Sequence, residues 1–188
     1  MKRAPNRLIP KKMFLTHGVG YHKDRLNSFE DALRNGGIEK FNLVTVSSIF
    51  PPACKCIPRA KGLADIQAGE VIHCVMSRLD SNEPGRMLAA AIGLAEPADR
   101  ENSYGYISEH HSYGQTSHIA GEYAEDLAAQ MLGTTLGIDI DPEKAWDERK
   151  DLYLASGRII KTRNIAHSAR VPKDGRWTTV FAAAVFII

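Results

Sequence analysis

Two adjacent serines in the stretch NLVTVSSIFPP, residues 42–52, carry hydroxyl groups that could react with their own backbone. The Ser48 hydroxyl lies next to the Ser47 carbonyl in the covalent structure, so proximity supplies much of the activation that a serine lacks. Attack on that carbonyl turns the peptide bond into an ester. β-Elimination then releases Ser47 as a new C-terminus and leaves dehydroalanine at position 48, which hydrolyses to ammonia and a pyruvoyl group. The sequence thus permits the chain to make its own ketone cofactor.

The residues after the serine pair restrict the backbone. Pro51 and Pro52 fix φ at their own positions and bias Phe50 toward an extended conformation, so the downstream side cannot relax into a helix. Self-cleavage needs a geometry that ordinary turns avoid and that only rigid surroundings maintain. The competing interpretation is that the serines are solvent-facing strand residues and that the prolines merely end the strand.

Length and composition indicate one compact domain, residues 1–188, with 44% hydrophobic residues. Lys and Arg number 24 against 22 acidic residues, so the net charge of +2 predicts neither a nucleic-acid nor an anionic-membrane partner. The basic N-terminal lead lacks the apolar run of a secretory signal, which favours a cytoplasmic location. The longest apolar run, VFAAAVFII, is shorter than the roughly 20 residues that cross a bilayer, so no membrane span is expected.

The three cysteines, Cys54, Cys56 and Cys74, form an odd set, and we expect reduced thiols. Cys54 and Cys56, together with the adjacent His73 and Cys74, offer an alternative interpretation as a zinc site. That alternative is weak, because a C-x-C spacing is not diagnostic and buried cysteine is common.

The elements expected to position the serine pair follow from hydrophobic periodicity and turn residues. A strand at 12–17 should reach a glycine-rich turn at Gly18 and Gly20, and a helix at 27–37 should begin at Asn27 or Ser28 and stop at Gly36-Gly37. One strand should run through 41–50 and carry both serines, and residues 53–69 should be irregular.

The second half of the chain predicts an alternation of strands and helices. The expected strands lie at 70–79, 87–97, 104–111, 157–169 and 177–188, the second and third as a hairpin, with a helix at 117–132 that ends at Gly133 and a charged, partly helical connection at 138–156. The final strand is continuously apolar, which predicts burial on both faces. The predicted fold is a layered α/β (α+β) sandwich.

Three sequence blocks resemble the pyruvoyl-dependent arginine decarboxylases: SFEDALRNGGIEKFNLVTVSSIFPP, YGYISEHH and AGEYAEDLAA. The likeness extends from about Lys12 to the C-terminal strand, and the Ser-Ser-Ile-x-Pro-Pro block coincides with the self-cleavage chemistry. It implies an αββα-type sandwich of the pyruvoyl-dependent histidine and arginine decarboxylase kind. It also implies a trimer of cleaved αβ protomers, or a dimer of such trimers.

The resemblance implies that Ser47 ends a β chain, residues 1–47, and that Ser48 becomes the pyruvoyl terminus of an α chain, residues 48–188. The ketone would form a Schiff base with the α-amine of L-arginine and accept the electrons left by carbon dioxide, giving agmatine. Neither pyridoxal phosphate nor a metal would be needed, which fits the lack of a convincing phosphate loop or ligand cluster in the sequence.

Three further site residues come from the resemblance. Asn42 matches an asparagine implicated in processing and catalysis. Six extended residues span roughly 20 Å, so Asn42 meets Ser48 only if the strand bends or if Asn42 reaches a neighbouring subunit, and we favour the neighbour. Glu109 matches a proton donor, with His110 and His111 as alternatives. Glu30 takes the place of an aspartate that faces the substrate guanidinium, and its extra methylene leaves lysine or ornithine open as substrates.

Two other classes of protein remain as alternatives at this stage. One is an unprocessed family member that acts as a structural or regulatory partner without catalysis. The other is a serine hydrolase that uses Ser47 or Ser48 with a histidine, although no G-x-S-x-G motif is present. Self-cleavage separates both from the decarboxylase, since each alternative leaves the chain whole.

Overall fold

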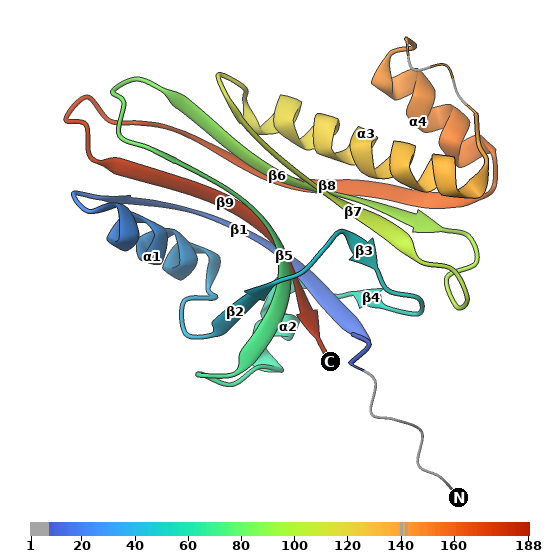
Figure 1. Cartoon of the computed structure of the whole chain (residues 1–188), viewed down its shortest axis with the longest axis horizontal. Coiled ribbons are helices and arrows are strands. Elements are labelled where there is room, and N and C mark those ends of the chain that lie inside the picture. The colour runs from blue at the N-terminus through green and yellow to red at the C-terminus, as the bar shows by residue number, and fades with distance from the viewer. Residues whose placement is uncertain (1–7, 140, 142) are drawn as a thin grey trace, which may run out of the picture.

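The computed structural model describes residues 8–139, 141 and 143–188. Its elements are β1 (Lys12–His22), α1 (Arg25–Gly36), β2 (Asn42–Thr45), β3 (Ile49–Phe50), β4 (Lys55–Cys56), α2 (Arg59–Ala64), β5 (Val71–Ser81), β6 (Met87–Pro97), β7 (Gly105–Tyr113), α3 (Ser117–Leu136), α4 (Trp146–Ala155), β8 (Ile159–Arg170) and β9 (Trp177–Ile187). Figure 1 shows the long strands stacked in layers with helices outside them.

Two sheets form the centre of the described part of the chain. Sheet A has the strand order β2-β5-β9-β1-β4, and sheet B has the order β3-β7-β6-β8. Helix α1 covers the outer face of sheet A and helix α3 covers the outer face of sheet B (Figure 1). The expected αββα sandwich is therefore confirmed. One apolar cluster, including Phe14 and Phe181, packs between α1 and sheet A, while another, including Ile92 and Ile107, lies between the sheets.

Strand β9 occupies the middle of sheet A, between β1 and β5. Its side chains alternate between the two faces, with Phe181 and Val185 in the cluster under α1 and Ala182 and Ala184 in the cluster between the sheets. The burial on both faces predicted from the continuous apolar run is confirmed. The hairpin of β6 and β7 is confirmed as well.

Three predicted boundaries are wrong, each because tertiary packing outweighs a local signal. Strand β1 does not turn at Gly18 and Gly20 but continues to His22, because these glycines allow close packing of α1: a Cβ on Gly20 would come within 2.1 Å of the Ser28 carbonyl oxygen. Helix α1 begins earlier, capped by Asp24.

The end of α3 is displaced in the same way. The helix passes Gly133, whose bare Cα makes room for the ring of Tyr153 of α4, and ends at Gly137 in the left-handed conformation. Residues 53–69, expected to be irregular, contain the short strand β4 and the short helix α2. Among the described residues, no helix is both long enough and apolar enough to cross a bilayer.

Candidate active site

The serine pair lies where the chain passes from one sheet to the other. The single strand predicted for 41–50 is in fact two strands: β2 pairs in parallel with β5 of sheet A, and β3 pairs antiparallel with β7 of sheet B. Residues 46–48 connect them. The Val46 amide donates to the Cys74 carbonyl at 3.0 Å, and the Ser48 carbonyl accepts from the Ile107 amide at 2.8 Å. Both ends of the connection are thus held by different sheets.

The backbone makes a tight turn at Ser48. The Ile49 amide donates a hydrogen bond to the Ser47 carbonyl oxygen at 3.0 Å, which spans a single intervening residue. Such a bond defines a γ-turn, and the negative φ of Ser48 makes it an inverse one. A hydrogen bond to this oxygen favours the negative charge that develops there when a nucleophile attacks the carbonyl carbon. The carbonyl that self-cleavage requires as its electrophile is therefore already polarised.

The two prolines shape the next turn. The Cys54 amide donates to the Pro51 carbonyl at 3.2 Å, and Ala53 has a φ of 58°. This is the pattern of a type II turn, in which proline suits the second position and the third takes positive φ. The turn leads from sheet B at β3 to sheet A at β4. Pro51 and Pro52 thus fix the downstream end of the serine segment, as their sequence positions predicted.

A cavity of about 230 Å³ opens beside the serine segment. Its walls include Val46, Ser47 and Ile49, and they also include His73 of β5. Ser47 is exposed and Ser48 is partly buried. Ser47, the residue before the position at which the ketone would form, therefore lines a space that a small molecule can enter.

Glu109 lies in β7, two residues beyond Ile107, whose amide binds the Ser48 carbonyl. Alternate strand residues share a face, so Glu109 is on the same side of sheet B as Ile107, which packs between the sheets. Desolvation of the carboxyl raises the pKa of Glu109, and nearby His111 partly opposes this rise. A raised pKa leaves more of this carboxyl protonated at a given pH than an ordinary glutamate, as a proton donor requires.

The two neighbouring histidines differ in position. The ring of His110 lies 4.4 Å from the ring of Tyr123 of α3, centroid to centroid, and its Nε2 forms a hydrogen bond with Gln115 at 2.8 Å, so this ring lies on the outer face of sheet B. His111 is on the side of Glu109. Of the two alternative donors proposed from the sequence, only His111 lies near Glu109.

Comparison with known proteins identifies the family. Residues 12–188 match the family model for pyruvoyl-dependent arginine decarboxylase. The chain is 59% identical over 180 residues to pyruvoyl-dependent arginine decarboxylase 2 of Methanosarcina mazei, covering 96% of this chain and 98% of that protein. It is 54% identical to the pyruvoyl-dependent arginine decarboxylase of Methanococcoides burtonii, covering 96% and 100% of the two chains. The chain belongs to the pyruvoyl-dependent arginine decarboxylase family. The resemblance inferred from the three sequence blocks is confirmed.

The pyruvoyl group that defines this family fits the residues present. Position 48 has a serine, the residue type from which the resemblance implies that the group derives, and the preceding carbonyl accepts a hydrogen bond from the Ile49 amide. The cysteines do not provide a metal centre: the described residues contain no group of three or more His, Cys, Asp or Glu that could hold an ion. Burial raises the pKa of Cys54 to about 12 and that of Cys74 to about 11, so both thiols stay protonated.

Asn42, the residue matched to a processing asparagine of the arginine decarboxylases, lies at the exposed start of β2. Its Nδ2 donates to the Gly69 carbonyl at 2.8 Å. Strand β2 alone extends about 10 Å from Asn42 to Thr45, and Val46 and Ser47 lie between the end of this strand and Ser48. The chain crosses between sheets after β2, so the single strand expected for 41–50 is interrupted between Asn42 and Ser48.

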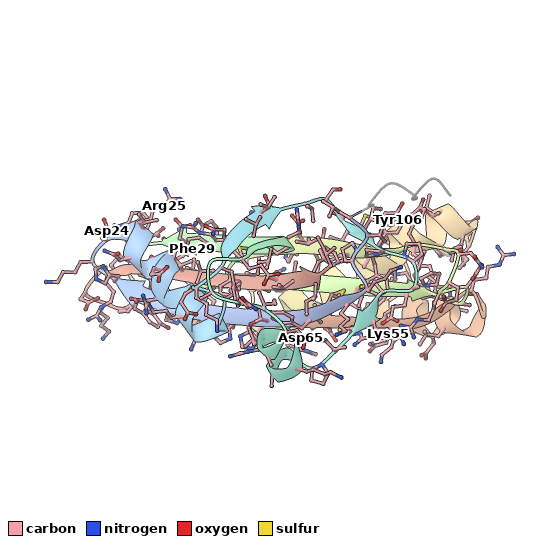
Figure 2. The ribbon with its side chains drawn as sticks, turned by 90° about the horizontal axis from the view of Figure 1, so that it is seen from below. Asp24, Arg25, Phe29, Lys55, Asp65 and Tyr106 are labelled. Carbon is pink, nitrogen blue, oxygen red and sulfur yellow. The ribbon has the colours of Figure 1, made fainter. Side chains whose placement is uncertain are left out.

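Glu30, matched to the guanidinium-binding aspartate of the family, lies on α1. Its Oε1 accepts from Nη2 of Arg34 at 2.9 Å, one helical turn away. Figure 2 shows the neighbouring Phe29 toward one end of the molecule and Tyr106, which pairs with Ile49, toward the other. Helix α1 also covers the outer face of sheet A, whereas Glu109 shares with Ile107 the face of β7 that is turned toward sheet A. One protomer does not bring Glu30 and Ser48 together.

The sequence reasoning missed two features of this site. The first is the hydrogen bond from Ile49 to Ser47, which only the turn at Ser48 creates. The second is His73, which the sequence suggested only as a zinc ligand and which lies on the wall of the Ser47 cavity. No local pattern signals either feature, because each depends on the pairing of β2 with β5 and of β3 with β7.

Proposed function

We propose that this chain cleaves itself between Ser47 and Ser48 and then decarboxylates L-arginine to agmatine and carbon dioxide. The observation that supports this most strongly is the inverse γ-turn, in which the Ser47 carbonyl is polarised by the Ile49 amide directly beside the Ser48 hydroxyl. The names of relatives that are 52–59% identical over nearly their whole length point to the same activity.

The self-cleavage uses atoms of the chain itself. Ser48 Oγ adds to the Ser47 carbonyl carbon, and the bond from that carbon to the Ser48 nitrogen breaks, which leaves an ester and a free amine. Loss of the Ser48 Cα proton then breaks the Cβ–Oγ bond and frees the Ser47 carboxylate. Addition of water and loss of ammonia convert residue 48 into the pyruvoyl group. Residues 1–47 and 48–188 remain folded together through the pairing of β1 with β9 and of β2 with β5.

The pyruvoyl group supplies a ketone that binds the substrate amine covalently and accepts the electrons left when carbon dioxide departs. Glu109 donates the proton that replaces the lost carboxylate at the substrate Cα, because its raised pKa favours the protonated form.

The complete site includes a neighbouring subunit. Strands β2 and β3 are the edges of their sheets, and the exposed side chains of Val44, Val46, Ile49 and Val71 make this edge apolar. A neighbour docked there would bring its Asn42, and its Glu30 for the substrate guanidinium, toward Ser48 of the first protomer, in a trimer or a dimer of trimers. A monomeric variant that kept full decarboxylase activity would contradict this arrangement.

The proposal is tested by intact-mass measurement of the purified protein together with an assay for carbon dioxide release. Wild type should give two fragments, the larger with an N-terminus blocked to Edman sequencing, and should decarboxylate arginine. Ser48→Ala should stay whole and inactive, since it lacks the attacking oxygen. Parallel assays with lysine and ornithine test whether the longer Glu30 changes the substrate preference. Carbon dioxide release by an uncleaved chain would refute the proposal.

A further inference from the structure

His73 lies beside the serine segment because of the way β2 pairs. In the parallel ladder of β2 and β5, His73 is opposite Val44, and the Val46 amide binds the carbonyl of the next β5 residue, Cys74. The alternate residues Val75 and Ser77 face sheet B, since Val75 packs between the sheets and Ser77 Oγ donates to the His110 carbonyl at 2.6 Å. His73 therefore faces sheet B as well, toward the crossing chain.

The cavity beside Ser47 contains two polar side chains in an otherwise apolar wall. Ser47 and His73 both line it, and the other lining residues are aliphatic, proline or phenylalanine. His73 is thus the lining side chain of this cavity whose ring nitrogens can serve in general acid–base chemistry. Cys74, next to it, points to the opposite face, into the cluster under α1.

The His73 ring has an unused nitrogen. Its Nδ1 is buried and has no hydrogen-bond partner among the residues that the structure describes. A buried polar atom without a partner destabilises the folded state, and such atoms are rare enough in native structures to require an explanation. A role in moving a proton explains why this position has an imidazole and not an apolar ring.

We propose that His73 is the proton-transfer residue of the first self-cleavage reaction, an inference that rests on the proposed function. His73 accepts the proton of Ser48 Oγ as this oxygen bonds to the Ser47 carbonyl carbon. It returns the proton to the Ser48 nitrogen as the carbon–nitrogen bond breaks. The imidazole ends the reaction in its starting protonation state, and the products are the ester and the amine. No other reactant is consumed.

The test follows cleavage of freshly synthesised precursor by denaturing gel and intact mass. His73→Ala should lower the first-order rate of cleavage about 100-fold, within the range known for general acid–base groups. Because the substitution enlarges a cavity of about 230 Å³, added imidazole should enter it and restore the rate at least tenfold. A folded variant that cleaves at the wild-type rate, or that stays slow with imidazole, would overturn the inference.

Hydroxylamine distinguishes the two chemical steps, since it splits esters rapidly but leaves amides intact. If His73 acts in ester formation, His73→Ala precursor should stay whole in hydroxylamine. Rapid splitting would mean that the ester forms without His73, which overturns the inference. The matched control is His118→Ala, because His118 is an exposed histidine of α3, and it should cleave at the wild-type rate.

Circular dichroism establishes that each variant is folded. Should His73→Ala fail to fold, His73→Gln is judged by its cleavage rate instead, because glutamine keeps hydrogen-bonding capacity but does not take up a proton. Slow cleavage in a native fold supports the inference, and the wild-type rate refutes it. Wild-type precursor that never cleaves would instead refute the proposed function, so the two failures are distinguishable.

Discussion

At the scale of single residues, the carbonyl groups of Ser47 and Ser48 accept hydrogen bonds from different parts of the chain. The Ser47 carbonyl binds the Ile49 amide inside the turn, and the Ser48 carbonyl binds the Ile107 amide of another strand. In the proposed self-cleavage, the first bond polarises the carbonyl that is attacked, and the second holds the residue that attacks. Strand β7, which provides the second bond, also carries Glu109, two residues beyond Ile107.

Glu109→Gln separates catalysis from processing. We expect decarboxylation to fall by about 10²- to 10⁴-fold, because an amide keeps the shape of the side chain but supplies no acidic proton. Most of the Ser47–Ser48 cleavage should remain. The raised pKa of Glu109 further predicts that wild-type turnover declines as pH rises through that pKa, since the donor form is then lost. Carbon dioxide release and intact mass are measured on the same sample.

The control for this experiment is Glu83→Gln. Glu83 lies in an exposed turn and pairs with Arg86, so its loss of charge should leave turnover unchanged. Full activity of Glu109→Gln would contradict the proposed role of Glu109 and would favour His111 as the donor.

At the scale of elements, the close contact of α3 with sheet B depends on small residues. Strand β6 lies between β7 and β8 and is rich in alanine where α3 covers it. At Gly93, a Cβ atom would come within 2.0 Å of the Ala124 carbonyl oxygen of α3. Ser108 of β7 donates a hydrogen bond to the same carbonyl. This contact fixes β7, and with it the strand that binds Ser48.

Gly93→Ala should therefore destabilise the protein. The clash is with backbone, which cannot rotate away, so α3 must shift, and overpacking of this kind costs about 1–3 kcal/mol in the free energy of unfolding. Urea denaturation of wild type and variant measures the difference. Glu122→Ala, on the exposed side of α3, is the control and should change stability by less than about 0.5 kcal/mol. Equal midpoints for Gly93→Ala and wild type would contradict the packing argument.

At the scale of the whole molecule, two histidines meet between the sheets. His17 of β1 and His167 of β8 stack with ring centroids 4.7 Å apart and planes 12° from parallel. Burial lowers the pKa of both, and for His17 the neighbouring His167 and Arg59 lower it further. Protonation of this pair would place like charges together inside the sandwich, so the native state binds these protons less readily than the unfolded chain.

Because of this histidine pair, we expect the free energy of unfolding to decrease on mild acidification. Both native pKa values lie below the unfolded value of about 6.5. The contribution of the neutral histidine pair to the free energy of unfolding is therefore complete above that pH, and it is lost as the pH falls through the native pKa values. The slope is at most about 1.4 kcal/mol per pH unit for each histidine. Thermal melts from pH 7.5 to 5 should show a smaller decline for His167→Gln than for wild type. If the melting temperatures of the variant and of wild type fell equally between these pH values, the histidine pair would not be the cause of the decline.

The sequence alone determined the chemistry that the serine pair can perform, the family and the alternation of elements. These follow from covalent adjacency, from ordered sequence blocks and from periodicities that local residues create. The continuous apolar run of β9 likewise predicted burial on both faces, because such a run has no polar side to expose.

Only the tertiary structure decided how the serine segment is held. The β-forming residues on its two sides look alike locally, yet β2 joins sheet A and β3 joins sheet B, since their partners β5 and β7 lie far away in the sequence. The same distant pairing turns the chain at Ser48 and brings His73 beside Ser47. Strand pairing depends on contacts across the whole chain, and a local pattern does not encode which partner each strand will find.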